Sequence, residues 1–432
     1  MSERKMIYLC LAHMSEAGME QKYVKEAFDT NWVVPMGPNV NAFEADLEEF
    51  VNRRDSSTSL GMTDWESRKV VCLSAGTAAV HLALIACGVK AGDEVLVQSF
   101  TFCASSHPIT YLGAKPVFVD SERETWNMDP ELLEKAIVER KEATGKYPKA
   151  IIPVALYGMP YDCEKIMAIA DKYGIPVIED AAEGMGSRFD GQVLGTFGRF
   201  GVLSFNGNKM ITTSGGGALI CRSAEDANEI MWYATQARDA YPYYEHTAIG
   251  YNYRMSNVCA GIGRGQMTVL DDHIAHHKHV QQLYRELLAD VPGVTLHDQP
   301  ADGRYDSNFW LCAATLDPSV KIVGQENAYK EVIKSAVGGA AGVIKAVESA
   351  VTDCQPNDNV EALRVFMLDK KVECRPVWKP MHKQPVYADA VAYVNGVSED
   401  IFKVGFCLPA GPAVTDEDVK YIVECIKEAI VK

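Results

Sequence analysis

Short apolar runs alternate with segments of helical periodicity from about residue 70 onward. Segments 77–89, 129–143 and 163–174 have the period of helices. The apolar runs lack polar alternation, which is typical of strands buried on both faces. The pattern therefore predicts an α/β fold with a mostly parallel, seven-stranded sheet between helices. The predicted strands are 70–73, 94–98, 115–119, 150–155, 175–179, 200–205 and 217–221.

The later part of the chain predicts a second domain. The chain has 432 residues, more than the about 100 to 200 residues of a typical domain. A long helical pattern at 271–288 leads into mixed strand and helix signals that end in a helix at 416–431. We expect a large domain over residues 1–270 and a smaller C-terminal α+β domain over 271–432. The polar segment 53–69 is predicted to be a surface insertion.

Composition excludes several classes of protein. No apolar run approaches the about 20 residues of a membrane helix, and the apolar stretch at the start is too short for a signal peptide, so we expect a cytoplasmic protein without a membrane partner. The net charge of -16 argues against binding to nucleic acid. Twelve cysteines without a CxxC spacing favour reduced thiols. No metal site is predicted: four histidines in 273–279 favour a solvated helix face.

Ligands of such sheets bind beyond the carboxyl ends of the strands. The first predicted strand ends in Ser74-Ala-Gly-Thr, where a helix begins, and the free N–H groups of Gly76 and Thr77 suit a phosphate. Capping of that helix by Thr77 or Ser74 is about as plausible. Phe100 and Phe102 follow the second strand, where a core role is the more common one for an aromatic side chain.

Two later strands end in chargeable side chains. Asp180 follows 175–179, where a carboxylate can cap a helix or hold a protonated ring nitrogen. Ser204, Asn206 and Lys209 stand at the end of 200–205, within SFNGNKMITTSGGG. A phosphate cradle, an aromatic side chain, an aspartate and a lysine at one sheet edge are the parts needed to bind pyridoxal phosphate. The glycines of GIGRG at 261–265 follow no strand, so they indicate helix packing and not a nicotinamide cofactor site.

Ordered motifs along nearly the whole chain resemble the DegT/StrS-type sugar aminotransferases, which have the aspartate-aminotransferase fold (fold type I). They include SAGTAAVHLAL, IEDAAEGMGS, SFNGNKMITTSGGG, YGYNYRMSNVCAGIG and RPVWKPMHKQPVY. Within the family, NGNKMITTSGGG, the segment 235–246 and RPVWKPMH look most like enzymes that aminate UDP-4-keto-6-deoxy-N-acetylhexosamines, as in bacillosamine synthesis.

The resemblance implies a site for pyridoxal 5'-phosphate. It makes Lys209 the Schiff-base lysine, whose amine also transfers the proton. It places Glu183 near the ring's 3-hydroxyl, where the family often has His or Gln. The other cofactor contacts that it implies are Gly76, Thr77 and Ser204 at the phosphate, Phe102 against the ring, Asp180 at the ring nitrogen, Asn206 beside the lysine, and Asn252 at the phosphate of a neighbouring subunit.

It also implies partners and a reaction. The contribution of Asn252 to a neighbouring subunit implies a homodimer with shared active sites. Arg375, Trp378 and His382 lie in the motif that the family has near the sugar nucleotide. The implied reaction moves the amino group of glutamate to C4 of a nucleotide-linked keto sugar for glycan biosynthesis. Alternatives are a dTDP- or GDP-linked sugar and a catalytically silent, cofactor-binding regulator; the intact Lys209 argues against a related dehydratase that has histidine there.

Overall fold

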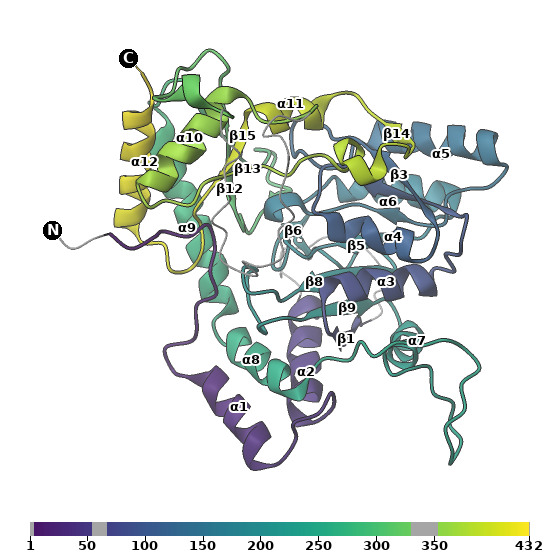
Figure 1. The fold of residues 1–432 in the computed structure, drawn as a ribbon. Coiled ribbons are helices and arrows are strands. Elements are labelled where there is room, and N and C mark those ends of the chain that lie inside the picture. Colours follow the sequence, from purple (N-terminus) through teal and green to yellow (C-terminus); the bar gives the residue numbers. More distant parts are fainter. Residues whose placement is uncertain (1–3, 54–66, 330–352, 432) are drawn as a thin grey trace.

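The computed structural model describes residues 4–53, 67–329 and 353–431, and its main feature is one large sheet (Figure 1). Two four-stranded halves are joined by parallel bridges between Ile151 and Val177 and between Val154 and Asp180. The spatial order of the strands is β1 (Lys69–Leu73), β9 (Gly217–Cys221), β8 (Phe200–Ser204), β5 (Ile178–Asp180), β4 (Ile151–Ile152), β2 (Glu94–Gln98), β3 (Lys115–Val119) and β14 (Ala392–Tyr393).

The prediction of a mostly parallel α/β sheet is confirmed. Among these strands, β9 alone runs against its neighbours, β1 and β8. Two strands are shorter than predicted because Pro153 and Pro176 have no N–H to donate to a ladder. The edge strand β14 was not predicted; a pair of residues is too short to show any alternation.

Helices cover both faces of the large sheet, and the strand side chains alternate between two cores. Cys72 and Leu96 belong to the core on one face, whereas Leu73 and Val97 belong to the core on the other. This double burial explains why the strands lack polar alternation. The helices in this part of the chain are α1 (Met19–Asp29), which packs on α8, and α2 (Pro38–Asn52), α3 (Gly76–Ala86), α4 (His107–Tyr111), α5 (Pro130–Thr144), α6 (Cys163–Tyr173), α7 (Ala224–Ala234) and α8 (Asn257–Met267).

The glycine-rich stretch 261–265 lies in α8 and packs against α1 and α2. A Cβ atom on Gly263 would lie 2.6 Å from the Phe43 ring, and one on Gly265 would lie 2.5 Å from the backbone nitrogen of Glu20. These glycines permit close helix contact, as the sequence predicted, and they form no dinucleotide loop.

A second, antiparallel sheet lies beside the chain ends, at the upper left of Figure 1. Ile7 bridges Val372, so the N-terminal segment joins this part of the molecule. A domain division at residue 270 stays a prediction. The second sheet and its surroundings contain β10 (Val294–Leu296), β12 (Cys312–Leu316), β15 (Gly405–Leu408), β13 (Arg375–Pro376), α9 (Leu270–Leu288), α10 (Asp358–Asp369), α11 (Val397–Val404) and α12 (Asp416–Ala429). A small third sheet is formed by β6 (Arg188–Phe189), β7 (Gln192–Val193) and β11 (Tyr305–Asp306).

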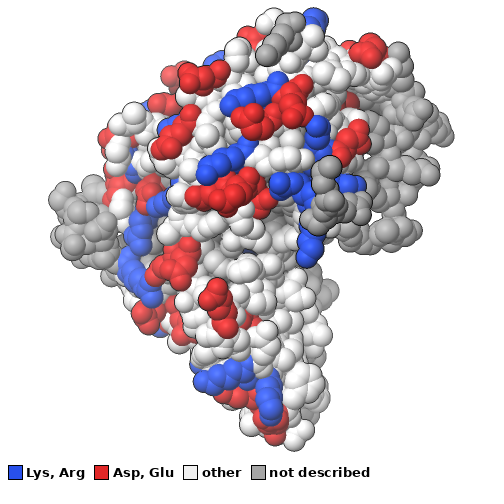
Figure 2. Space-filling model, turned by 90° about the vertical axis from the view of Figure 1, so that its left-hand side faces the viewer, with Lys and Arg blue, Asp and Glu red and all other residues white. Residues whose placement is uncertain are grey.

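Basic and acidic side chains are interspersed on the face drawn in Figure 2. Elsewhere in the described chain, Arg285 of α9 pairs with Asp298, and Lys370 pairs with Glu428 of α12, so these charges neutralise one another locally. Most of the predicted insertion, residues 54–66, lies outside the described residues. Within 4–53, 67–329 and 353–431, no helix is long and apolar enough to cross a membrane.

The histidine group of α9 differs from the predicted solvated face. His273 and His277 are buried, and their Nδ1 atoms lie 3.2 Å from the carbonyl oxygens of Met210 and Phe309. His279 is exposed and pairs with Asp416. The sequence interpretation erred because one side of this helix faces the core, and a histidine on that side is buried with it. In the described part of the chain, no group of three or more His, Cys, Asp or Glu side chains is arranged to hold a metal.

We expect His277 to make the stability of the protein depend on pH. Burial lowers its pKa from 6.5 to about 3. A histidine with a lowered folded pKa contributes stability above its unfolded pKa and loses that contribution as the pH falls towards the folded pKa. Between pH 7 and pH 5, one such group costs about 2 kcal/mol of the free energy of unfolding. The free energy of unfolding can be measured with urea at pH 7 and at pH 5 for both proteins. The decrease from pH 7 to pH 5 should be smaller by about 2 kcal/mol in His277→Gln than in the wild type. Equal decreases in the two proteins would contradict this expectation.

Candidate active site

A pocket of about 230 Å³ lies at the carboxyl ends of β1, β2, β5 and β8. Residues at the ends of these strands line the pocket, together with Trp310 and Trp378 from the later part of the chain. The structure brings nine of the residues singled out in the sequence to this pocket: Gly76, Thr77, Phe102, Asp180, Glu183, Ser204, Asn206, Lys209 and Trp378.

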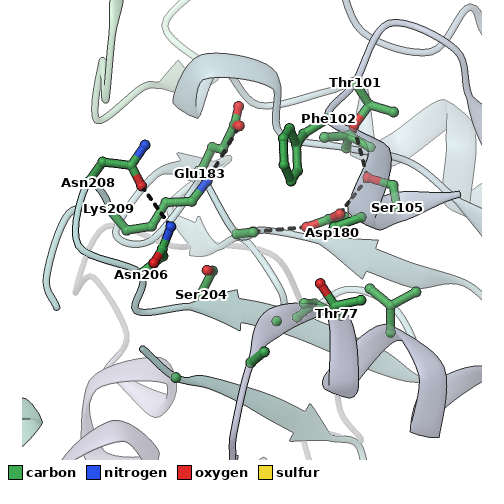
Figure 3. A pocket seen from close by; sticks show the side chains of 18 of the residues that line it. Thr77, Thr101, Phe102, Ser105, Asp180, Glu183, Ser204, Asn206, Asn208 and Lys209 are labelled. Carbon is green, nitrogen blue, oxygen red and sulfur yellow. Dashed lines mark hydrogen bonds and ion pairs between the residues drawn. The ribbon is translucent and has the colours of Figure 1, made fainter. Parts of the chain in front are cut away.

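One end of the pocket is formed by the N-terminus of α3. No described side chain caps this helix, whose N-cap residue is Ala75, so capping by Thr77 or Ser74 does not occur. Gly217 lets β9 approach closely, because a Cβ atom there would lie 2.4 Å from the Gly76 nitrogen. The hydroxyls of Thr77 and Ser204 lie beside the helix start (Figure 3). Uncapped N–H groups and hydroxyls at a positive dipole end suit a phosphate.

Asp180, the last residue of β5, presents a buried carboxylate on the opposite side of the pocket from Lys209 (Figure 3). Its oxygens accept hydrogen bonds from Ser105 Oγ at 2.6 Å and from the Ala182 N–H at 3.1 Å. Burial raises the pKa of Asp180, while these bonds and the charge of Lys209 act in the opposite direction. The carboxyl group has room for one more partner, and a protonated ring nitrogen would stabilise its charged form.

Lys209 projects its amine towards Glu183, with Nζ 3.5 Å from Oε1 (Figure 3). The amine also lies 4.2 Å from the centre of the Trp310 ring. The other oxygen of Glu183 accepts the Tyr157 N–H at 2.8 Å. Burial raises the pKa of Glu183, and the nearby ammonium of Lys209 opposes this shift. The lysine side chain is only 13% exposed, so this is a sheltered amine facing a pocket and not a solvated surface charge.

Phe102 and Trp378 line the pocket, and the Phe102 ring lies above the gap between Lys209 and Asp180 (Figure 3). The Phe102 ring is 49% exposed, whereas Phe100 is fully buried, so only Phe100 has the core role that is common for such residues. Phe102 packs at a tilt against Trp378, with ring centres 5.4 Å apart. An exposed ring over a polar gap is suited to cover a flat, aromatic ligand.

Three residues singled out by resemblance do not line this pocket. The Arg375 guanidinium binds Glu373, with Nε 2.8 Å from Oε1. His382 is bonded to Ser99 Oγ at 2.6 Å and lies 3.2 Å from Glu399. Asn252 is exposed on the surface.

The sequence interpretation missed several residues of the site. Ser105 orients Asp180 and itself contacts Thr101, with 2.8 Å between the hydroxyl oxygens. Trp310 lies beneath the lysine amine and donates from Nε1 to the Asn208 carbonyl at 2.6 Å. The stretch SFTFCAS after the second strand was a usable signal for Ser105. Nothing near Trp310 in the sequence distinguishes it from a core aromatic.

The geometry fits pyridoxal phosphate. An uncapped helix start matches its phosphate, a buried carboxylate matches its ring nitrogen, and a sheltered lysine matches its aldehyde. The exposed face of Phe102 completes a site for a flat ring.

Known proteins resemble the chain over nearly its whole length. The sequence profile of the DegT/DnrJ/EryC1/StrS aminotransferase family matches residues 15–341 and 340–427. The chain is 40% identical over 426 residues to a Bacillus subtilis (strain 168) protein named as the pyridoxal phosphate-dependent aminotransferase EpsN, covering 98% of this chain and 95% of that one. It is 32% identical to GDP-perosamine synthase of Escherichia coli O157:H7, covering 98% and 99%.

Two further similarities bear on sugar type and fold. The UDP-2-acetamido-2-deoxy-3-oxo-D-glucuronate aminotransferase of Pseudomonas aeruginosa (strain ATCC 15692 / PAO1) is 36% identical over 259 residues, 59% of this chain and 65% of that one. A crystal structure of a DegT DnrJ EryC1 StrS aminotransferase from Brucella abortus has a TM-score of 0.78 at 24% identity and covers 95% of both chains. The fold therefore agrees with the expected type I arrangement.

Proposed function

The chain belongs to the DegT/DnrJ/EryC1/StrS aminotransferase family, and from this premise we propose that it transfers the amino group of glutamate to C4 of a UDP-linked 4-keto-6-deoxy-N-acetylhexosamine. It is a pyridoxal-phosphate-dependent aminotransferase of nucleotide-linked keto sugars. The observation that carries the proposal is the placement of Lys209 and Asp180 on opposite sides of one pocket, above an uncapped helix start.

Each residue of the pocket then has a chemical task. When bound, pyridoxal phosphate supplies an aldehyde for the amino group and a ring that accepts electrons. The N–H groups of Gly76 and Thr77 and the Ser204 hydroxyl would bind the phosphate, and Asp180 would hold a proton on the ring nitrogen. The Lys209 amine would hold the cofactor in the resting enzyme and, once released by the amino donor, would act as the base that takes the proton from Cα of that donor.

Glu183 keeps the Lys209 amine oriented towards the pocket. It lies 3.5 Å from Nζ, and the same carboxylate is fixed by the Tyr157 N–H. Glu183 is thus a fixed, oppositely charged partner for the Lys209 amine on this side of the pocket. This is a different task from contact with the ring's 3-hydroxyl, which the family resemblance implies for this position.

Support for the UDP-linked sugar comes from the segment that contains Trp378. Its sequence resembles the enzymes acting on UDP-4-keto-6-deoxy-N-acetylhexosamines, and Trp378 lines the pocket, where a sugar or a base can pack on it. Lys379, the next residue, is paired with Asp353 at 3.6 Å, and in this proposal its charge would turn from that partner to the diphosphate of the substrate. The Pseudomonas relative, whose name specifies a UDP-linked acetamido sugar, agrees with this choice of nucleotide.

A GDP-linked keto sugar is the second candidate. It is favoured by the similarity over nearly the whole chain to GDP-perosamine synthase. The test is to incubate the enzyme and glutamate with UDP-, GDP- and dTDP-linked 4-keto-6-deoxy sugars and to identify the products by NMR. We expect amination at C4 of the UDP compound with at least tenfold higher kcat/KM than for the others. Turnover of the GDP compound alone would contradict our choice and support the second candidate.

We also propose a homodimer in which Asn252 acts in the neighbouring subunit. Asn252 is exposed. It pairs through the backbone with Thr235, at the base of a loop that projects from the body near α7 (Figure 1). The loop exposes Tyr243 and Ile249, and exposed apolar side chains of this kind are typical of an interface.

Mixed dimers test the shared site. If Lys209→Ala and Asn252→Ala each inactivate the enzyme, mixing the two chains should restore about a quarter of the wild-type rate, because half of the dimers are mixed and each has one intact site. Analytical ultracentrifugation supplies the control for dimer formation. A mixture no more active than its parental proteins would contradict the shared site.

A further inference from the structure

Tyr157 has an unusual backbone conformation beside the pocket. It follows β4 and has φ 54° and ψ 18°, in the left-handed region, although it is an aromatic residue and is only 3% exposed. A bulky residue in this region costs free energy and persists only where its surroundings determine it. The conformation therefore calls for both a structural cause and a consequence.

The cause is a set of contacts around the next residue. Gly158 has φ 92°, and a Cβ atom on it would lie 1.8 Å from Asn308 Oδ1, so this turn tolerates no side chain there. Ser187 Oγ donates to the Gly158 carbonyl at 2.6 Å and accepts the Asn308 N–H at 2.9 Å. Asn308 Nδ2 also donates to the Glu183 carbonyl at 2.9 Å. These bonds tie the turn to the segment that carries Glu183.

The consequence is that Tyr157 contacts two sides of the pocket. Its N–H donates to Glu183 Oε2 at 2.8 Å, and the other oxygen of Glu183 faces Lys209. Its hydroxyl oxygen accepts the backbone N–H of Trp378 at 2.8 Å, and the two rings are nearly parallel, with centres 6.3 Å apart. Tyr157 therefore contacts Glu183, the partner of Lys209, through its backbone N–H, and it contacts Trp378 through its side-chain hydroxyl.

We propose that Tyr157 is a positioning residue that sets the pocket-lining Trp378 against the nucleotide-linked sugar through its hydroxyl, while its N–H independently orients Glu183 and Lys209. This inference rests on the proposed function, since it takes Trp378 to face the sugar nucleotide. It implies that the two roles can be separated: losing the hydroxyl should weaken substrate binding without altering the chemistry at Lys209.

Tyr157→Phe tests the separation because it removes the hydroxyl and retains the ring and the N–H. We expect the KM for the keto sugar nucleotide to rise about five- to tenfold with kcat within twofold, as for the loss of one hydrogen bond. Hydrogen–deuterium exchange of the peptide 375–381, followed by mass spectrometry, should show faster exchange of the Trp378 amide. The matched control is Tyr161→Phe, which removes an equally buried hydroxyl from the same connection and should change neither quantity.

The outcomes distinguish this inference from the proposed function. In Tyr157→Phe, a KM within twofold of wild type or an unchanged exchange rate of the Trp378 amide would overturn the role of Tyr157. Equal effects on these two quantities in Tyr161→Phe would overturn it as well. A wild-type enzyme that aminates none of the keto sugars would overturn the proposed function. Amide exchange requires no substrate, so it reports on the link between Tyr157 and Trp378 in either case.

Discussion

Replacing Lys209 with alanine is expected to lower kcat by about 10³-fold or more, because it removes from the pocket the amine that we propose moves the proton. The pocket keeps its helix start, Asp180 and Phe102, so the variant should still bind pyridoxal phosphate. Folding should survive, because burial raises the pKa of Glu183 and this carboxyl can therefore take up a proton when the ammonium is lost. Steady-state kinetics, equilibrium dialysis of the cofactor and thermal unfolding measure the three quantities.

An exposed lysine provides the control for this variant. Lys172 on α6 pairs with Glu134, its side chain is 61% exposed, and it lines no part of the pocket. Lys172→Ala should leave kcat within twofold, since surface pairs contribute little. A Lys209→Ala enzyme that retained more than a tenth of the wild-type kcat would contradict the role assigned to Lys209.

Asp180→Asn is expected to lower kcat by about a hundredfold or more while changing stability little. Asparagine has nearly the same shape and its carbonyl oxygen still accepts a hydrogen bond, but a neutral amide does not hold a proton on the ring nitrogen. The measurements are kcat at saturating glutamate and keto sugar, and the temperature of unfolding.

A substitution of the preceding residue, Glu179, provides the control for Asp180→Asn. Glu179 is also a buried carboxylate of β5, but it accepts the N–H groups of Gly195, Phe197 and Gly198, away from the pocket. Glu179→Gln should destabilise the fold by about 1–3 kcal/mol and leave the kcat of the folded enzyme nearly unchanged. The same loss of kcat in both variants would mean that Asp180 has only a structural task.

The sheet, and the gathering of several candidate cofactor residues at one edge of it, could be predicted because both follow from local patterns. Apolar runs mark strands buried on both faces, and in a parallel sheet the residues after such strands meet at one edge. Gly76, Asp180 and Lys209 are therefore brought together by topology alone. The pairing of Glu183 with Lys209 could not be predicted, because it depends on which way two side chains point after their strands end.

Residues that act through long-range contacts were not predictable from the chain. Trp310 lies 101 positions after Lys209 in the sequence, and only the packing of the second part of the chain brings its ring beneath the amine. Tyr157 reads as an ordinary residue after a strand, and its left-handed conformation arises from Asn308 and Ser187. His277 shows the reverse: a polar residue in a helical pattern faces the core because the apolar side of α9 includes it.

In segment 375–383, resemblance to the family predicted some positions at the pocket correctly and others not. It led to three candidate sugar contacts, and the structure brings Trp378 to the pocket. His382 instead fastens this segment to Ser99 at the end of β2, and Arg375 binds the nearby Glu373. A motif identifies a segment near a site, whereas the partner of each side chain is decided by neighbours from elsewhere in the chain.

Attachment of the cofactor to Lys209 is the central claim, and one measurement tests it most directly. The purified protein, loaded with pyridoxal phosphate, is reduced with borohydride to fix the linkage, then digested and analysed by mass spectrometry. We predict a single modified peptide that carries the added mass on Lys209, and no modification there when the protein is loaded as Lys209→Ala. Cofactor found on another lysine, or bound without any covalent linkage before turnover, would contradict the account.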